Sequence, residues 1–426
     1  MGFGTKKLLI AASVMCAILP CLGPALAREV NPDPLGGWHI LQADYDQDNL
    51  LDVLSFEWDF YMVHDAASGF YATIGYLVSN PRGRLSDVAS ILPDGGSLAF
   101  VGTLAGQKPI AHFVNFGREF TQASAAQRLF EAVEPETGFH GTQTPVRGGG
   151  PNDEDLMRLS GQTEAFEWDL KVYPEWGDRD QGAYRPVHGT DVGRLPGEVF
   201  SVDVIWPRTR VQGTVLVKAT GQLLQIDAHG YRENSWGRFA LIFDGWDFFV
   251  FSEDRDEMAA QGVDPAQGVS LVFQTYHKSK LLDFCDASFY DRGELKTMRF
   301  RALDGEMGWR HLAWTFDRES WQCLPTELDI GLANDAYRID VQVTFPMQDQ
   351  RPLLSNLTLP VAAYFIQEIF PSYEGKIRDK RTGEIIRTFS GRGGAEFSHA
   401  KSTRLWPAAG WECQSWGDKY FSKAMP

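Results

Sequence analysis

The sequence predicts an all-β fold, and two observations carry this prediction. Apolar and polar residues alternate with a period of two along most of the 426-residue chain, as they do in half-buried strands. Aromatic residues, which favour strands, make up 13% of the chain. Many short strands with few helices are typical of antiparallel barrels or sandwiches.

The first strands form a hairpin. In residues 55–63, Trp58 and Phe60 share one face, while Glu57 and Asp59 share the other. A turn at 64–69 leads into a second alternating run at 70–78. Further strands are predicted at 199–206, 211–218, 223–231, 238–243, 248–252, 269–276, 295–302, 312–316, 337–345 and 384–389.

Helical patterns are few. Residues 123–133 and 360–369 are the better candidates, the second with a proline at a tolerated first position. The segment 147–155, with the sequence RGGGPNDED, has the composition of a loop.

The chain begins with a pattern typical of a secretory signal peptide. Lys6 and Lys7 precede an apolar run at 8–19, and the run is followed by the small-x-small pattern Ala25-Leu26-Ala27. We therefore expect residues 1–27 to be removed and the mature protein to be exported, either periplasmic or secreted. No apolar stretch in the mature chain is long enough for a membrane-spanning helix.

The net charge argues against one class of function, and the cysteine content limits the number of disulfides. The formal charge of −16 argues against a protein that binds nucleic acid by neutralising phosphates. After removal of the signal peptide, Cys285, Cys323 and Cys413 remain, so one disulfide can form, and its pairing stays open. The oligomeric state stays open as well.

An acidic segment at 44–52 resembles the start of a calcium loop, with carboxylates at alternate positions. Asn49 replaces the usual glycine and Ser55 the usual final glutamate, so an acidic lead-in loop is the favoured interpretation. The nine histidines show no metal-ligand spacing, and no nucleotide or cofactor motif is present. We therefore expect no cofactor and no metal.

Four segments, in order, resemble the AttH-like and carotenoid 1,2-hydratase (hydroxyneurosporene synthase) superfamily. They are Glu57-Trp58-Asp59-Phe60-Tyr61, Gly230-Tyr231-Arg232-Glu233-Asn234-Ser235-Trp236-Gly237, Gly245-Trp246-Asp247-Phe248-Phe249, and Gln367-Glu368 with Ser372-Tyr373-Glu374-Gly375. The resemblance implies two lipocalin-like antiparallel β-barrels in tandem, at 28–290 and 291–426. The sequence departs from the family pattern at Arg232 and Asn234, near positions where relatives often carry histidine.

The residues of one strand suggest a chemistry. Alternation puts Asp227, His229, Tyr231 and Glu233 on one face, opposite Ile226 and Ala228. Burial in an apolar cavity would raise the pKa of such a carboxyl group and keep it protonated, ready to protonate an alkene. The alternative is that this row faces solvent while Ile226 and Ala228 face the core.

Aromatic faces would stabilise the resulting carbocation, and Trp236 and Trp246 are the candidates. We expect the catalytic groups to be Glu233, His229, Tyr231 and Asp247, although buried hydrogen bonding to a loop is the alternative role of Asp247. Further ligand contacts are expected from Asn234, Glu57 and Asp59. For Glu57 and Asp59, however, an exposed strand face is favoured over an inward-facing acid pair.

The sequence therefore predicts a cofactor-independent acid–base enzyme of the hydratase, cyclase or isomerase type. Its substrate would be a lipophilic unsaturated small molecule such as a terpenoid or carotenoid. The alternative is a non-catalytic periplasmic carrier of such a ligand. The site is expected in the first barrel or in the cleft between the barrels.

Overall fold

The computed structural model describes most of the chain after residue 54. The described residues are 38, 55–79, 95–104, 107, 109–124, 126–151, 153–176, 187–190, 199–238, 245–276, 283–317, 322–346, 351–354, 364–400 and 425–426. The expected signal peptide at 1–27 and the acidic segment at 44–52 lie outside these residues.

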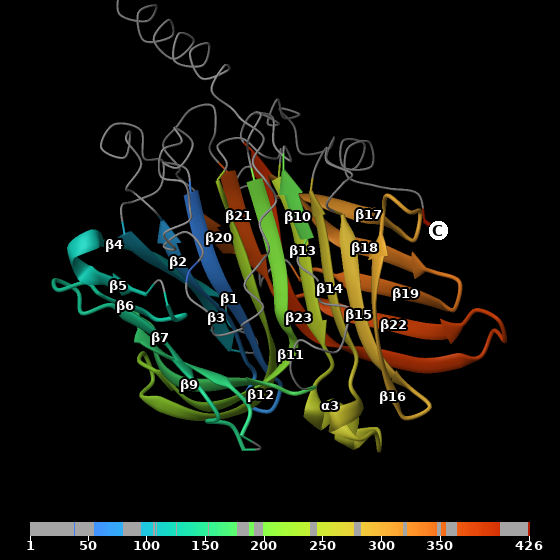
Figure 1. Ribbon diagram of the computed structural model, residues 1–426, viewed down its shortest axis with the longest axis horizontal. Helices are drawn as coiled ribbons and strands as arrows, with labels where there is room; N and C mark the ends of the chain where they lie inside the picture. Colours follow the sequence, from blue (N-terminus) through green and yellow to red (C-terminus); the bar gives the residue numbers. More distant parts are fainter. Residues whose placement is uncertain are drawn as a thin grey trace, which may run out of the picture.

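Two antiparallel sheets lie side by side along the long axis of the molecule (Figure 1). In the described part of the chain, the first sheet has twelve strands in the order β4-β3-β2-β1-β12-β11-β9-β8-β7-β6-β5, with β10 paired to β11. These strands are β1 (Ser55–Asp65), β2 (Phe70–Ser79), β3 (Gly95–Leu104), β4 (Ile110–Gly117), β5 (Thr121–Ala123), β6 (Phe130–Val133), β7 (His140–Val146), β8 (Leu156–Gln162), β9 (Phe166–Pro174), β10 (Val187–Thr190), β11 (Val199–Val217) and β12 (Gln222–Arg238).

The second sheet has eleven strands within the described residues. Its order is β16-β15-β14-β13-β23-β22-β19-β18-β17, with β21 paired to both β20 and β23. These strands are β13 (Gly245–Ser252), β14 (Ser270–Tyr276), β15 (Phe284–Asp291), β16 (Glu294–Arg301), β17 (Met307–Asp317), β18 (Gln322–Ala333), β19 (Tyr337–Thr344), β20 (Arg351–Leu354), β21 (Tyr364–Ile369), β22 (Ser372–Asp379) and β23 (Ile385–Ala400).

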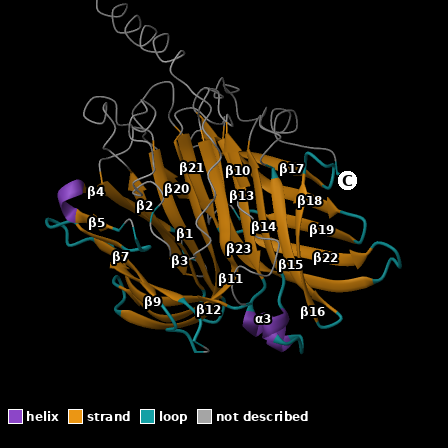
Figure 2. Cartoon of the chain, in the orientation of Figure 1, coloured by secondary structure: helices purple, strands orange, loops and turns teal. Residues whose placement is uncertain are grey.

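Within the described residues, the helices are short and lie outside the sheets. They are the helix α3 (Arg255–Ala260) and the 3₁₀ turns η4 (Arg118–Phe120) and η6 (Pro265–Gln267). Asp254 caps α3, and its carboxylate accepts from the backbone N–H groups of Asp256 and Glu257. Figure 2 shows α3 at the lower edge of the view, below the strands and near the middle of the long axis. Among the described residues, no helix is both long and apolar enough to cross a bilayer.

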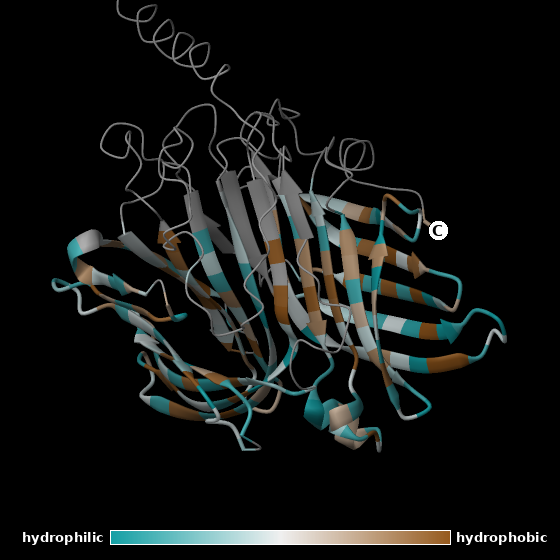
Figure 3. Cartoon of the chain, viewed as in Figure 1, coloured by the Kyte–Doolittle hydropathy of each residue, from teal (hydrophilic) through white to brown (hydrophobic). Residues whose placement is uncertain are grey.

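Each sheet curls around its own apolar core. The core of the first sheet includes Tyr61, Phe130, Trp168 and Ile226, and that of the second includes Phe273, Trp309, Ile339 and Phe389. The first sheet is nearly closed, because the backbone N–H of Gly96 in β3 donates to Oγ1 of Thr121 in β5, 3.1 Å away. Polar and apolar residues alternate along the strands of both sheets (Figure 3). The predicted all-β fold with two curled antiparallel sheets is confirmed.

A third apolar cluster joins the two sheets. Phe60, Val204 and Tyr231 of the first sheet pack against Phe248 and Val272 of the second. The second sheet thus covers the outer face of β1 and the part of the outer face of β12 that includes Tyr231, while the start of β12 is exposed to solvent.

The change of sheet falls earlier than the boundary expected at 290/291. The first sheet ends with β12 at Arg238, and the second begins with β13 at Gly245. The strands β13, β14 and β15 all lie in the second sheet. The expected boundary would have assigned β13, β14 and most of β15 to the first barrel. β14 is buried at every position and β15 at every position but Tyr290, so both faces of these strands are covered. The sequence pattern does not show which sheet they join.

The two expected helices are wrong where the structure describes them. Residues 121–123 and 130–133 are β5 and β6, because Phe130 and Ala132 are buried while Glu131 and Val133 are exposed, which is the period of a strand. Tyr364–Ile369 is β21, and the preceding part of the expected helix lies outside the described residues. The strands expected at 199–206 and 211–218 form one long strand, β11.

Candidate functional site

A pocket lies where the two sheets meet. β1 and β12 supply Trp58, Phe60, Glu233 and Ser235 from the first sheet. The second sheet supplies the remaining lining residues, which are Trp246, Asp247, Phe248, Gln274, Tyr276 and Glu396. About 470 Å³ is free of protein atoms, counting the opening to solvent. Aromatic walls with a few converging polar groups are typical of a small-molecule site.

Glu233 is the polar centre of this pocket. Its side chain is buried, and Oε2 accepts hydrogen bonds from the Tyr231 hydroxyl at 2.8 Å and from Nε2 of Gln274 at 3.1 Å. Oε1 lies 3.4 Å from Nε1 of Trp58 and 3.3 Å from Oγ of Ser235. The carboxyl group is thus held in one orientation by donors from both sheets.

Burial dominates the acidity of this carboxyl group. Desolvation raises the pKa of Glu233 from 4.5 to about 7, although the hydrogen bonds from Tyr231 and Trp58 act in the opposite direction. The negative charge of Glu396 across the pocket adds to the increase. Near neutral pH, Glu233 is therefore poised to donate or to accept a proton.

The row of polar residues on β12 is divided by the second sheet. Ile226 and Ala228 lie in the core of the first sheet, so Asp227, His229, Tyr231 and Glu233, on the opposite face of β12, point outward from it. Asp227 is about half exposed and pairs with Arg210 at 2.8 Å. Tyr231 and Glu233 are covered by the second sheet. The row thus points neither into the first barrel nor, along its whole length, into solvent.

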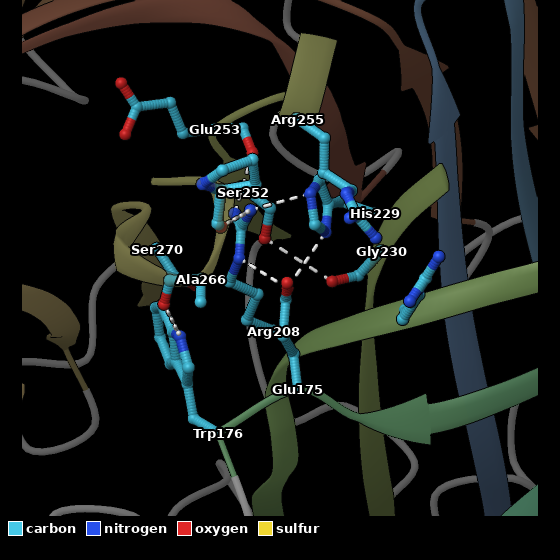
Figure 4. A network of polar contacts seen from close by, with 12 residues as sticks. Glu175, Trp176, Arg208, His229, Gly230, Ser252, Glu253, Arg255, Ala266 and Ser270 are labelled. Carbon is cyan, nitrogen blue, oxygen red and sulfur yellow. Dashed lines mark hydrogen bonds and ion pairs between the residues drawn. The ribbon is translucent and has the colours of Figure 1, made fainter. Parts of the chain in front are cut away.

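His229 belongs to a different network, shown in Figure 4. Its Nε2 lies 2.7 Å from Nη2 of Arg208, and its Nδ1 lies 3.0 Å from Oε2 of Glu175. Because a guanidinium only donates, Nε2 must accept, and the ring proton sits on Nδ1 facing Glu175. Burial and Arg208 lower the pKa of His229, which keeps the ring neutral. It does not line the pocket.

Glu57, Asp59 and Asn234 lie inside the first sheet, away from the pocket. Both carboxylates are fully buried, which corrects the expectation of an exposed strand face. Arg128 contacts Glu57 and lies 3.7 Å from Asp59, and Arg232 donates to Asp59 at 3.1 Å. Two carboxylates thus face two guanidinium groups. Alternation on β12 places Arg232 on the same face as Ile226 and Ala228, but it could not reveal the contribution of Arg128, which comes from another part of the chain.

The three remaining candidates have different surroundings. Trp246 lines the pocket, and its Nε1 donates to Oε1 of Glu396. Trp236 lies on the inward face of β12, the same face as Arg232 and Asn234. Asp247 borders the pocket, and its Oδ2 lies 3.8 Å from Nε2 of His311, which is also buried.

Sequence reasoning missed seven residues of the pocket, which are Trp58, Phe60, Ser235, Phe248, Gln274, Tyr276 and Glu396. The parity of Trp58 on β1 was visible, but nothing in the sequence indicates that the second sheet covers this face. The hydroxyl of Tyr276 donates to Gln274 at 2.8 Å, and Gln274 donates in turn to Glu233. Cys285 is a free, buried thiol, while the side chain of Cys323 and all of Cys413 lie outside the described residues.

Within the described residues, no group of three His, Cys, Asp or Glu side chains is arranged to hold a metal ion. No protein-family model and no curated protein matches the sequence.

Solved structures match the fold. Kievitone hydratase from Nectria haematococca aligns with a TM-score of 0.51 and 10% identity, over 89% of this chain and 98% of that chain. A protein of Nitrosomonas europaea described as AttH aligns with a TM-score of 0.48 and 13% identity, over 88% and 98%. CghA aligns with a TM-score of 0.47 and 9% identity, over 89% and 95%. At these identities the likeness is one of fold, and the match to kievitone hydratase confirms the expected tandem architecture.

Proposed function

We propose that this protein is a cofactor-independent acid–base enzyme that protonates a carbon–carbon double bond of a lipophilic small molecule. The reaction is of the hydratase, cyclase or isomerase type. The observation that carries the proposal is Glu233, a carboxyl group with a pKa of about 7 in a pocket walled by aromatic side chains. The expected signal peptide adds the proposal that the protein acts after export.

The chemistry follows from the lining of the pocket. Protonated Glu233 donates its proton to one alkene carbon, and the other carbon becomes a cation. Trp58, Trp246 and Phe248 line the same space, and aromatic faces attract a cation. Water or a nucleophile within the substrate then captures the cation. Tyr231 and Gln274 stabilise the carboxylate left behind, because each donates a hydrogen bond to it.

Kievitone hydratase has the same fold, and its name describes water addition, which agrees with this proposal. A carrier of lipophilic ligands would need the apolar walls but would have no use for a carboxyl group with a raised pKa. This difference makes the two functions separable by experiment.

The test compares the wild-type protein with Glu233→Gln on unsaturated probes. Citronellol and lycopene are incubated with each protein, and products that gain one water or change only their isomeric form are identified by mass spectrometry and chromatography. We expect Glu233→Gln to bind the probe like the wild type but to turn it over 10²- to 10⁴-fold more slowly, the usual range for loss of a general acid.

The matched control is Glu327→Gln, which removes the same charge from an exposed position of β18. It should turn over like the wild type. If the wild-type protein retains a lipophile from its native host, detected by mass spectrometry, but converts neither that compound nor the probes, the carrier function replaces the enzymatic one.

A further inference from the structure

A second carboxylate faces the pocket from the opposite sheet. Glu396 lies on β23, in register with Phe248 of β13, and it is half-buried. Its Oε1 accepts from Nε1 of Trp246, which fixes the carboxylate against one aromatic wall. Glu233 approaches from β12 of the first sheet. The pocket therefore receives Glu233 from the first sheet and two acidic side chains from the second, Asp247, which lies beside the buried His311, and Glu396.

The two carboxyl groups differ in their surroundings. Glu233 is buried among Tyr231, Gln274 and Ser235, while Glu396 is partly open to solvent. Two carboxyl groups that share a site do not both ionise easily, and the more buried one keeps the proton. This arrangement assigns the acid to Glu233 and the base to Glu396.

We propose that Glu396 is the general base of a water-addition reaction in which Glu233 is the general acid. The proposal rests on the proposed function and selects hydration among its reaction types. The proton of Glu233 forms a new C–H bond, and the oxygen of a water molecule forms the C–O bond at the cationic carbon. One proton of that water passes to Glu396. The substrate gains one water, and the proton on Glu396 returns through solvent to Glu233.

The first test needs no substrate. The protein is labelled with ¹³C at the glutamate side-chain carboxyl carbon, and Glu233→Gln and Glu396→Gln assign the two resonances. We expect the pKa of Glu233 to fall in Glu396→Gln, because the neighbouring negative charge is gone, and to stay unchanged in Glu327→Gln. An unchanged pKa of Glu233 in Glu396→Gln would overturn the pairing.

The second test separates the two roles with citronellol in D₂O. Protonation and its reversal need only Glu233 and place deuterium in the recovered alkene, whereas hydration needs Glu396 as well. We expect Glu396→Gln to keep deuterium incorporation and to lose hydration at least 10²-fold, and we expect Glu233→Gln to lose both. Circular dichroism and retained citronellol binding establish that each variant is folded.

The outcomes are distinguishable. If Glu233→Gln incorporates deuterium like the wild type, the proposed function fails. If Glu396→Gln hydrates citronellol as fast as the wild type while Glu233→Gln does not, Glu233 is the acid and the role of Glu396 is overturned.

Discussion

The hydroxyl of Tyr231 donates a 2.8 Å hydrogen bond to Oε2 of Glu233, two residues further along the same face of β12. This bond stabilises the ionised carboxylate and therefore limits the increase in pKa that burial causes. We predict that Tyr231→Phe raises the pKa of Glu233 above 7, by roughly one unit. The ¹³C carboxyl titration measures the change.

The control for this prediction is Tyr173→Phe, which removes a 2.8 Å bond to Gln212 elsewhere in the first sheet. It should leave the titration of Glu233 unchanged. A lower pKa in Tyr231→Phe would mean that the hydroxyl does not stabilise the carboxylate.

The raised pKa of Glu233 also makes stability depend on pH. Between pH 4.5 and 7, Glu233 ionises in the unfolded chain but stays protonated in the folded protein. The free energy of unfolding therefore falls as the pH rises through this window and levels off above it. The shift from 4.5 to about 7 corresponds to about 3 kcal/mol.

Glu233→Gln cannot ionise, so its contribution should be constant over the same range. Urea unfolding at pH 4.5 and pH 8 measures the difference between the two proteins. If the two stability curves run parallel, the pKa of Glu233 is not raised in the folded state.

The alternation of single strands predicted much of the fold, because burial of one face is a local property. β1, β2, β12, β14 and β19 were each found at their alternating runs. The docking of one sheet on the other is not local. Nothing in the sequence around Trp58 or Tyr231 shows whether an outward face meets water or a second sheet.

The same limit explains the candidate site. Tyr231 and Glu233 were identified from one strand, but their partner Gln274 and the opposing Glu396 come from strands of the other sheet. Glu396 stands between the buried Ala395 and Phe397. Strand alternation therefore places its side chain on the outer face of β23. Its position opposite Glu233 is a consequence of packing between sheets, which a single sequence does not encode in any local pattern.

His64 on β1 provides a prediction at acid pH. The side chain is buried, and neither ring nitrogen has a hydrogen-bond partner among the described residues. Burial, with smaller effects from Arg392 and His229, lowers its pKa from 6.5 to about 3. As the pH falls through this range, the unfolded chain binds a proton that the folded protein does not, so stability is lost.

We predict that His64→Phe removes this loss. At pH 5 the wild type should have lost about 2 kcal/mol relative to the variant, compared with their difference at pH 8. Because the comparison is between two pH values, any constant cost of the larger phenyl ring cancels. An equal difference at both values would show that His64 titrates normally.

Arg208 connects the two sheets through a buried network (Figure 4). Its Nε donates to Oε2 of Glu175 at 2.7 Å, and its Nη1 donates to the backbone carbonyl of Glu253, which follows β13, at 2.7 Å. Nη2 lies 2.7 Å from Nε2 of His229. The guanidinium group of Arg208 is fully buried. Its contacts join β11 to the second sheet.

Arg208→Met should therefore be strongly destabilising, by about 3–5 kcal/mol, because it leaves the carboxylate of Glu175 buried without its guanidinium. Arg210→Met is the matched control two residues along β11, where the pair with Asp227 is partly exposed, and it should cost at most about 1 kcal/mol. Urea unfolding at pH 7 measures both. Adding Glu175→Gln to Arg208→Met should recover part of the loss, since the orphaned charge is removed. If Arg208→Met and Arg210→Met lower the free energy of unfolding equally, the buried contacts of Arg208 do not contribute more than an exposed ion pair.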